Sequence, residues 1–117
     1  MKTMRELQKA VYDNNVVHGW HDGGPFAAAP ENIITKLMLV VTELAEAVEE
    51  IRNGHPYDKV YFTDGGKKPE GFAVELADAM IRLLDIAELL KIDMQEAIVL
   101  KHNYNITRPH RHGGKVI

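Results

Sequence analysis

Two acidic pairs, each set within a strongly apolar helical pattern, constrain the fold of this chain more than any other feature. In residues 33–51, apolar side chains recur at steps of three and four, which predicts one face of an α-helix. Glu43, Glu46 and Glu50 fall together on the neighbouring face, within roughly 60° of each other. This acidic row therefore runs beside the apolar stripe, at the edge of the core where helices meet.

Residues 72–90 repeat the arrangement, with Glu75 and Asp78 one helical turn apart. This segment is apolar nearly all the way round, which is typical of a buried helix. Because buried carboxylates without partners are costly, these acids must be protonated, paired with cations or bound to a metal. Two acidic pairs on two helices can converge on a divalent cation, and oxygen-only ligands suit Mg²⁺, Mn²⁺ or Ca²⁺.

The order of these motifs resembles that of a known family. Glu43-x-x-Glu46 followed by Glu75-x-x-Asp78 is similar to the ExxE…ExxD signature of the MazG-like all-α nucleoside triphosphate pyrophosphohydrolases. The resemblance covers most of the chain and includes two flanking groups of residues. The group before the first acidic helix is His18, Gly19, Trp20 and 36–39, and the group at the phosphate-side end is Lys101, Asn105, Arg108 and 110–115.

The resemblance implies an all-α, four-helix-bundle-like MazG fold with a loop insertion between the two acidic helices. It also implies the reaction, which is hydrolysis of a ribo- or deoxyribonucleoside triphosphate between its α and β phosphates. The products would be a nucleoside monophosphate and pyrophosphate. Residue spacing alone does not select this bond over the β–γ bond. Such an activity would either sanitise the nucleotide pool or control the level of a normal nucleotide.

For this chemistry we predict Mg²⁺, with Mn²⁺ as an alternative, bound by Glu43, Glu46, Glu75 and Asp78. One or two ions are compatible with four carboxylates, and either arrangement would bridge phosphate oxygens. The catalytic carboxylates are predicted to be Glu43, Glu46 and Glu50. Of these, Glu46 or Glu50 would take the proton from the attacking water, because it is the less fully engaged with the metal.

Six residues are predicted to bind the substrate, namely His18, Trp20, Lys36, Lys101, Asn105 and Arg108. Trp20 lies in a Gly-rich connection, where it either caps the end of the core or stacks on the nucleobase, a contact worth about 1–3 kcal/mol. Lys36 lies on roughly the same face as Glu43, two turns earlier, and is either solvated or in contact with a phosphate. The resemblance makes Lys101, Asn105 and Arg108 donors to phosphates.

The bulk composition predicts one soluble domain that spans residues 1–117. The net charge of −3 gives no basic field for a stable nucleic-acid partner, and no run reaches the roughly 18 apolar residues of a membrane span. With no Cys there is no disulfide framework, so the simplest expectation is a cytoplasmic protein. One thin domain cannot bury a helix that is apolar on every side, which predicts a homodimer or homotetramer.

Local signals predict where the helices begin and end. The first begins with a capping box at Thr3, and the second has Pro30 as its first residue. Residues 54–70 break the helical period and form the loop insertion. A third helix follows over 71–90, and a second capping-box pattern from Asp93 opens the last helix.

Three other functions fit the sequence less well. A di-iron carboxylate bundle needs Glu-x-x-His pairs, which the chain lacks. An HD-type phosphohydrolase would use the pair His21-Asp22, but this pair lies among glycines rather than on a packed helix. A non-catalytic helical interaction or oligomerisation module would pair its acids with Arg52, Arg82 and Lys36, and it would show no dependence on a metal.

Overall fold

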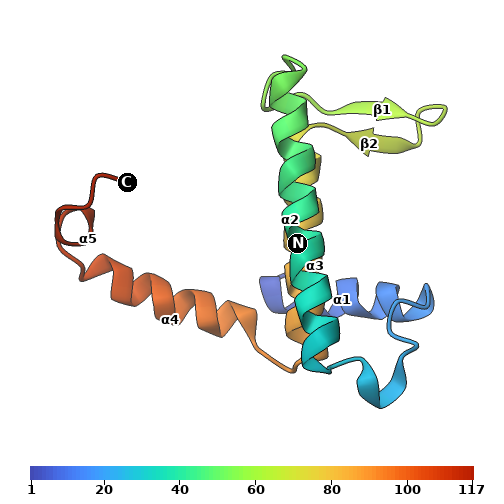
Figure 1. Ribbon diagram of the computed structural model, residues 1–117, viewed down its shortest axis with the longest axis horizontal. Coiled ribbons are helices and arrows are strands. Elements are labelled where there is room, and N and C mark those ends of the chain that lie inside the picture. Colours follow the sequence, from blue (N-terminus) through green and yellow to red (C-terminus); the bar gives the residue numbers. More distant parts are fainter.

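The computed structural model describes residues 1–117 and is mostly helical, which confirms the all-α class (Figure 1). Its elements are α1 (Met4–Val17), the 3-10 turn η1 (Gly24–Phe26), α2 (Pro30–Arg52), β1 (Tyr61–Thr63), β2 (Lys68–Glu70), α3 (Phe72–Leu89), α4 (Met94–Ile106) and α5 (Arg111–Gly114). None of these helices is both long enough and apolar enough to cross a membrane.

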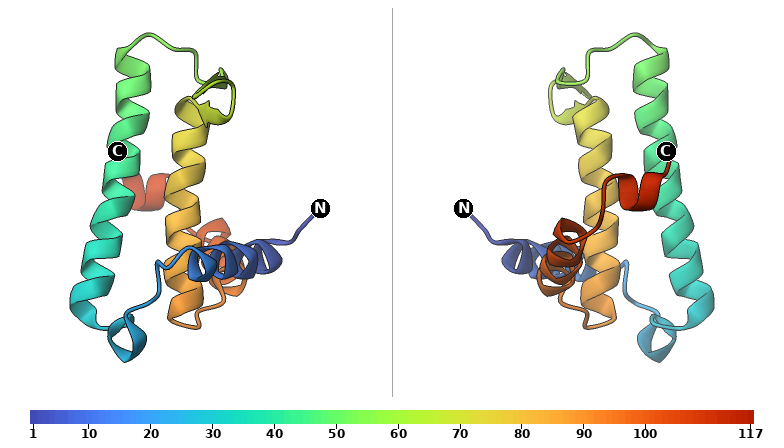
Figure 2. Two further views of the ribbon diagram at one scale, coloured as in Figure 1. Left: turned by 90° about the vertical axis from the view of Figure 1, so that its right-hand side faces the viewer. Right: turned by 90° about the vertical axis from the view of Figure 1, so that its left-hand side faces the viewer.

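The two acidic helices, α2 and α3, form the centre of the molecule. They lie side by side and run in opposite directions, and α1 crosses α3 at the end remote from the β-hairpin (Figure 2). A small buried cluster of Val40, Ala79 and Ile86 joins the pair, with Ile33 and Leu90 packed against it. Because these side chains hold the two helices face to face, acids placed one row away on each helix can face each other.

The predicted helix boundaries agree with the structure. The Thr3 hydroxyl accepts a hydrogen bond from the Glu6 backbone N–H while the Glu6 carboxylate accepts one from the Thr3 N–H, so the capping box is complete. Pro30 is the first residue of α2, where its missing N–H costs nothing. The Asp93 side chain accepts from the Glu96 N–H and so opens α4.

The loop insertion contains a short antiparallel hairpin, in which Tyr61 faces Glu70 and Thr63 faces Lys68. The sequence assigned 54–70 to a loop insertion, and within it the structure forms two paired strands, the second of which includes Pro69. Gly71 closes the hairpin at φ +131°, and a Cβ at this position would overlap the Lys59 carbonyl oxygen. The hairpin therefore has a fixed exit into the first turn of α3.

Helix α4 does not complete a four-helix bundle within one chain, contrary to the predicted architecture. It projects away from α2 and α3 and ends in α5, far from the acidic helices (Figure 1). The radius of gyration is 16.9 Å, against about 13 Å expected for a compact domain of this length. The reason lies in the α3–α4 turn, where Lys91 has φ +59° and the chain changes direction.

The predicted apolar faces are also largely uncovered in the single chain. On α2 only Val40 of the apolar stripe is buried, and its other members include exposed Leu37, Val41 and Val48. On α3 the expected burial holds for Leu84 and Ile86 but not for Leu76, Met80 or Leu83. Two helices in contact can cover only one side of each other, so the remaining faces stay open to solvent.

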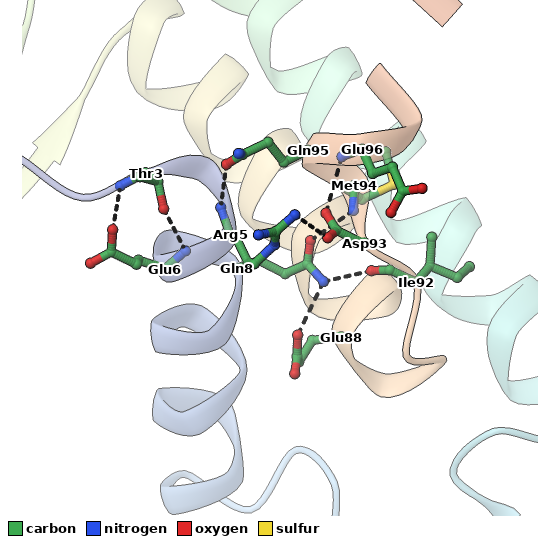
Figure 3. A network of polar contacts seen from close by, with 10 residues as sticks. All are labelled: Thr3, Arg5, Glu6, Gln8, Glu88, Ile92, Asp93, Met94, Gln95 and Glu96. Atoms are coloured by element: carbon green, nitrogen blue, oxygen red, sulfur yellow. Dashed lines mark hydrogen bonds and ion pairs between the residues drawn. The ribbon is translucent and has the colours of Figure 1, made fainter. Parts of the chain in front are cut away.

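Helix α4 is joined to the rest of the molecule through Gln8 of α1 (Figure 3). The buried Gln8 amide donates to the Ile92 carbonyl oxygen at 2.7 Å and to the Glu88 carboxylate at 3.1 Å, and its oxygen accepts from the Met94 N–H at 3.3 Å. Arg5 forms an ion pair with Asp93 in the same network. This network fixes the direction in which α4 leaves the body of the protein.

Candidate active site

The acids of the two central helices converge where the middle of α2 meets the first two turns of α3. Carboxylate oxygens of Glu43 on α2 and of Glu75 and Asp78 on α3 all lie within 4.8 Å of one another, and all three residues are half-buried. Glu75 and Asp78 reach the same point because they are one turn apart on α3. Three convergent oxygen ligands with no sulfur or nitrogen among them are suited to a hard divalent cation such as Mg²⁺.

The crowding of these acids alters their protonation. Burial, together with the negative charges of Asp78 and Glu43, raises the pKa of Glu75 to about 7. Burial also raises the pKa of Asp78, with Glu43 acting in the same direction, while Arg82 and Lys68 partly offset the shift. A divalent cation at this point would compete with protons for the same oxygens.

One of the four predicted ligands forms an ion pair. Arg82 Nε lies 2.8 Å from Glu43 Oε1, with the arginine side chain partly exposed and the glutamate mostly buried. Of the other two cations expected in the non-catalytic module, Arg52 pairs with Glu49 and Lys36 forms no ion pair. Glu75 and Asp78 form no ion pair, and Arg82 and Lys68 only partly offset the charge of Asp78.

Glu46 and Glu50 lie outside the three-residue cluster. Glu46 is exposed, and its charge adds to the burial and the nearer acids that raise the pKa of Glu75. Glu50 is buried and accepts hydrogen bonds from His55 Nδ1 at 2.5 Å and from the Tyr61 hydroxyl at 2.7 Å. These bonds lower the pKa of Glu50 and raise that of Tyr61 to about 12. Glu50 therefore anchors the hairpin to α2 and lies outside the group of three converging acids.

A cavity of about 300 Å³ opens beside the acid cluster and collects four of the predicted site residues. Its walls include Trp20, Lys36, Glu43 and Asp78, with an apolar side formed by α2 and α3. Trp20 comes from the connection between α1 and α2 and is 71% exposed, so its indole has little contact with the core. An aromatic ring, a lysine and two acids thus share one space, although they come from three different segments.

The other predicted substrate-binding residues lie elsewhere in the single chain. His18 ends α1, where its Nδ1–H donates to the Asn14 carbonyl oxygen at 2.7 Å, and it does not line the cavity. Lys101, Asn105 and Arg108 lie on or just after the projecting α4. The Lys101 and Arg108 cations lie 4.8 and 5.7 Å from the centre of the Tyr104 ring. The single chain does not bring these three residues to the acid cluster.

The cavity is also lined by three polar residues outside the predicted catalytic, metal-binding and substrate-binding sets, namely Asn15, Arg82 and Asp85. Of these, Asp85 is bound to His21, which the sequence linked only with Asp22. The signal available in the sequence was Asp85 itself, an acid within the most apolar part of α3 that needs a buried partner. The partner is 64 residues away, so local spacing could not identify it.

No family model, no curated protein and no solved structure matches this chain. A crowded acid cluster beside a cavity with an aromatic ring and a free lysine can hold a divalent cation and an anionic molecule with a flat, apolar portion.

Proposed function

We propose that the protein is a MazG-like nucleoside triphosphate pyrophosphohydrolase. It would hydrolyse a ribo- or deoxyribonucleoside triphosphate between the α and β phosphates, with Mg²⁺ or Mn²⁺ as cofactor. The observation that carries the proposal is the convergence of Glu43, Glu75 and Asp78 beside a cavity that also contains Trp20 and Lys36. The order of the acidic motifs, which resembles that family, supplies the choice of bond.

Different residues would bind the metal, contact a phosphate and accept the proton. Bound by Glu43, Glu75 and Asp78, Mg²⁺ would neutralise phosphate charge and lower the pKa of a water molecule. Lys36 has no ion pair within the chain and so can contact a phosphate. Glu46, exposed at the edge of the cluster, is free to accept a proton from the attacking water. Phosphoryl chemistry requires mainly such positioning and charge neutralisation.

We also propose that the active form is a homo-oligomer of two or four copies. The chain exposes 8839 Å², whereas a compact monomer of its mass is expected to expose about 6,400 Å². The excess, about 2,400 Å² per copy, is of the size that obligate interfaces bury. A second copy packed on the open faces of α2 and α3 could bring Lys101, Asn105 and Arg108 to the acid cluster.

Product analysis by ion-exchange chromatography tests the proposed reaction. The protein would be incubated with a panel of nucleoside triphosphates in Mg²⁺ or in EDTA. We expect monophosphate and pyrophosphate with Mg²⁺ only, and a loss of at least about a hundredfold in Glu43→Gln and Glu75→Gln. Glu49→Gln, on the exposed face of α2 beside Arg52, is the matched control and should retain activity. Diphosphate and phosphate as products would contradict the bond assignment.

The ion pair between Arg82 and Glu43 favours one other function, a non-catalytic helical oligomerisation module. In that case the acids would serve the fold, and neither Mg²⁺ nor EDTA would change any property of the protein. The crowding of Glu75 and Asp78, neither of which forms an ion pair, speaks against this function, because a purely structural helix gains nothing from two crowded acids. Absence of turnover for every triphosphate, in a folded protein, would favour the module.

A further inference from the structure

Asp85 and His21 form a buried polar pair at one end of the cavity. His21 Nε2 lies 2.8 Å from Asp85 Oδ1, and the two side chains are only 4% and 8% exposed. The imidazole stacks on the Tyr12 ring, with centroids 4.6 Å apart. Because an ionised carboxylate only accepts hydrogen bonds, His21 donates from Nε2, and its Nδ1 is left without a partner. The hydrogen bond from His21 therefore fixes the orientation of the Asp85 carboxylate.

Asp85 retains unused capacity to accept a hydrogen bond. Its Oδ1 is bound by His21, its Oδ2 has no hydrogen-bond partner in the chain, and Asp85 lines the cavity together with Asn15 and Trp20. A buried carboxylate with one donor is incompletely satisfied, and such groups gain from a further donor. The remaining oxygen, Oδ2, is thus available to a molecule that enters the cavity beside the Trp20 ring.

The spacing along α3 fits a nucleotide. Asp85 follows Asp78 by seven residues, which is two turns or about 10 Å along the helix axis. Asp78 belongs to the acid cluster, where phosphates would lie, and both residues line the same cavity. A nucleotide with its phosphates at the cluster would therefore extend its base towards Trp20 and Asp85.

We propose that Asp85, positioned by His21, selects nucleotides whose base carries an exocyclic amino group, as cytosine and adenine do. The inference rests on the proposed function and names the substrate class of that site. A carboxylate accepts a hydrogen bond from an amino group, but it repels the carbonyl oxygen that uracil and hypoxanthine carry at the same position. Asp85 is thus a specificity-determining residue and His21 a positioning residue.

The variant Asp85→Asn gives a directional test. His21 would still donate to the amide oxygen, since this is the only acceptor that the amide offers. The amide NH₂ would then take the place of Oδ2 and present a donor to the cavity. The preference should therefore move from the amino-bearing base towards its carbonyl-bearing counterpart, instead of affinity being lost equally for both.

Trp20 is the only tryptophan, so its fluorescence reports base binding without any need for turnover. The protein, with Mg²⁺ present, would be titrated with the matched pairs CMP and UMP, and AMP and IMP. We expect the amino-bearing member of each pair to bind about tenfold more tightly to the wild type. In Asp85→Asn this ratio should fall to one or below, and in Asp13→Asn, an exposed acid on α1, it should be unchanged.

His21→Leu provides a second variant, which keeps the Asp85 charge but removes its donor. It should reduce the amino preference without reversing it, and circular dichroism would establish that each variant is folded. Equal binding of both members of each pair by the wild type would overturn the inference, as would an unchanged ratio in folded Asp85→Asn or no fluorescence response to any nucleotide. Because monophosphates are not hydrolysed, these results are independent of the product analysis that tests the proposed function.

Discussion

At the scale of single residues, Glu75 shows most clearly that the metal-free site disfavours ionised carboxylates. Burial and two neighbouring negative charges act in the same direction, so the folded protein holds a proton on Glu75 up to about pH 7. The ordinary pKa of this group is 4.5, and the unfolded chain therefore releases the proton at a lower pH than the folded protein does. Ionised Glu75 consequently reduces the free energy of unfolding.

This linkage predicts the effect of Glu75→Gln in EDTA. The destabilisation by Glu75 is absent below about pH 4.5, grows as the pH rises towards 7 and is complete above that. Glu75→Gln should therefore have a higher melting temperature than the wild type at about pH 8, and the difference should shrink towards pH 4.5. Differential scanning calorimetry at both pH values measures it, with Glu49→Gln as control. A lower melting temperature for Glu75→Gln at about pH 8 would show that Glu75 stabilises the metal-free fold.

At the scale of elements, the junction of α1, α3 and α4 depends on Gln8. This amide donates to Glu88 and Ile92 and accepts from the Met94 N–H, so it joins the end of α3 to the start of α4 (Figure 3). Its side chain is almost wholly buried, and water cannot replace these bonds without rearrangement. The position of α4 therefore depends on Gln8, together with the contacts of Arg5 to Asp93 and Gln95.

We expect Gln8→Ala to lower the free energy of unfolding by about 1–3 kcal/mol, because it leaves the Ile92 carbonyl and the Met94 N–H without their partner. Urea denaturation followed by circular dichroism measures this change. Gln95→Ala is the matched control, since Gln95 accepts only one hydrogen bond, from the Arg5 N–H, and should cost less. Equal effects of the two substitutions would mean that the Gln8 network does not stabilise the junction.

The helices were predictable from the sequence, and the direction of α4 was not. Capping at Thr3 and Asp93, the proline at the start of α2 and the apolar period are local signals, and each corresponds to an observed boundary. The path of α4 depends on the conformation of Lys91 and on Gln8, which lies 84 residues from its acceptor Ile92. Such long-range bonds leave no periodic signature in a single sequence.

In the candidate site too, local spacing predicted some features, while others depended on contacts between distant parts of the chain. The spacing of the acids predicted the meeting of Glu43, Glu75 and Asp78, because a turn of helix fixes which residues share a face. The predicted position of Glu50 in that row was not sufficient to assign its role, since the hairpin supplies Tyr61 and His55 to the same carboxylate. The pairing of Asp85 with His21 depended on the fold of the connection between α1 and α2, which the sequence did not specify.

At the scale of the whole molecule, the open apolar faces are the dominant feature. The stripe of α2 that the sequence assigned to the core is mostly exposed, and α4 carries exposed Leu100 and Tyr104 away from the body. A chain that leaves this much apolar surface in water gains free energy by association. In the proposed oligomer, α4 of one copy could lie near the acid cluster of another, whereas the two are far apart within one chain.

We therefore expect light scattering coupled to size-exclusion chromatography to give the mass of two or four chains. Leu100→Glu on α4 and Met38→Glu on α2 would each place a charge on an exposed apolar face and should shift the protein towards monomers. Lys2→Glu, at the N-terminus outside these faces, introduces the same side chain and should leave the mass unchanged. A wild-type protein that elutes as a monomer would contradict the proposed assembly.

The central claim, that Glu43, Glu75 and Asp78 bind a divalent cation, is tested most directly by electron paramagnetic resonance of Mn²⁺. The signal of free Mn²⁺ decreases when the ion binds, so a titration gives both the affinity and the number of sites. We predict saturable binding that Mg²⁺ displaces, that weakens as the pH falls below about 7, and that is lost in Glu75→Gln but kept in Glu49→Gln. Equal binding by Glu75→Gln and the wild type, or no binding by either, would show that these three acids do not form a cation site.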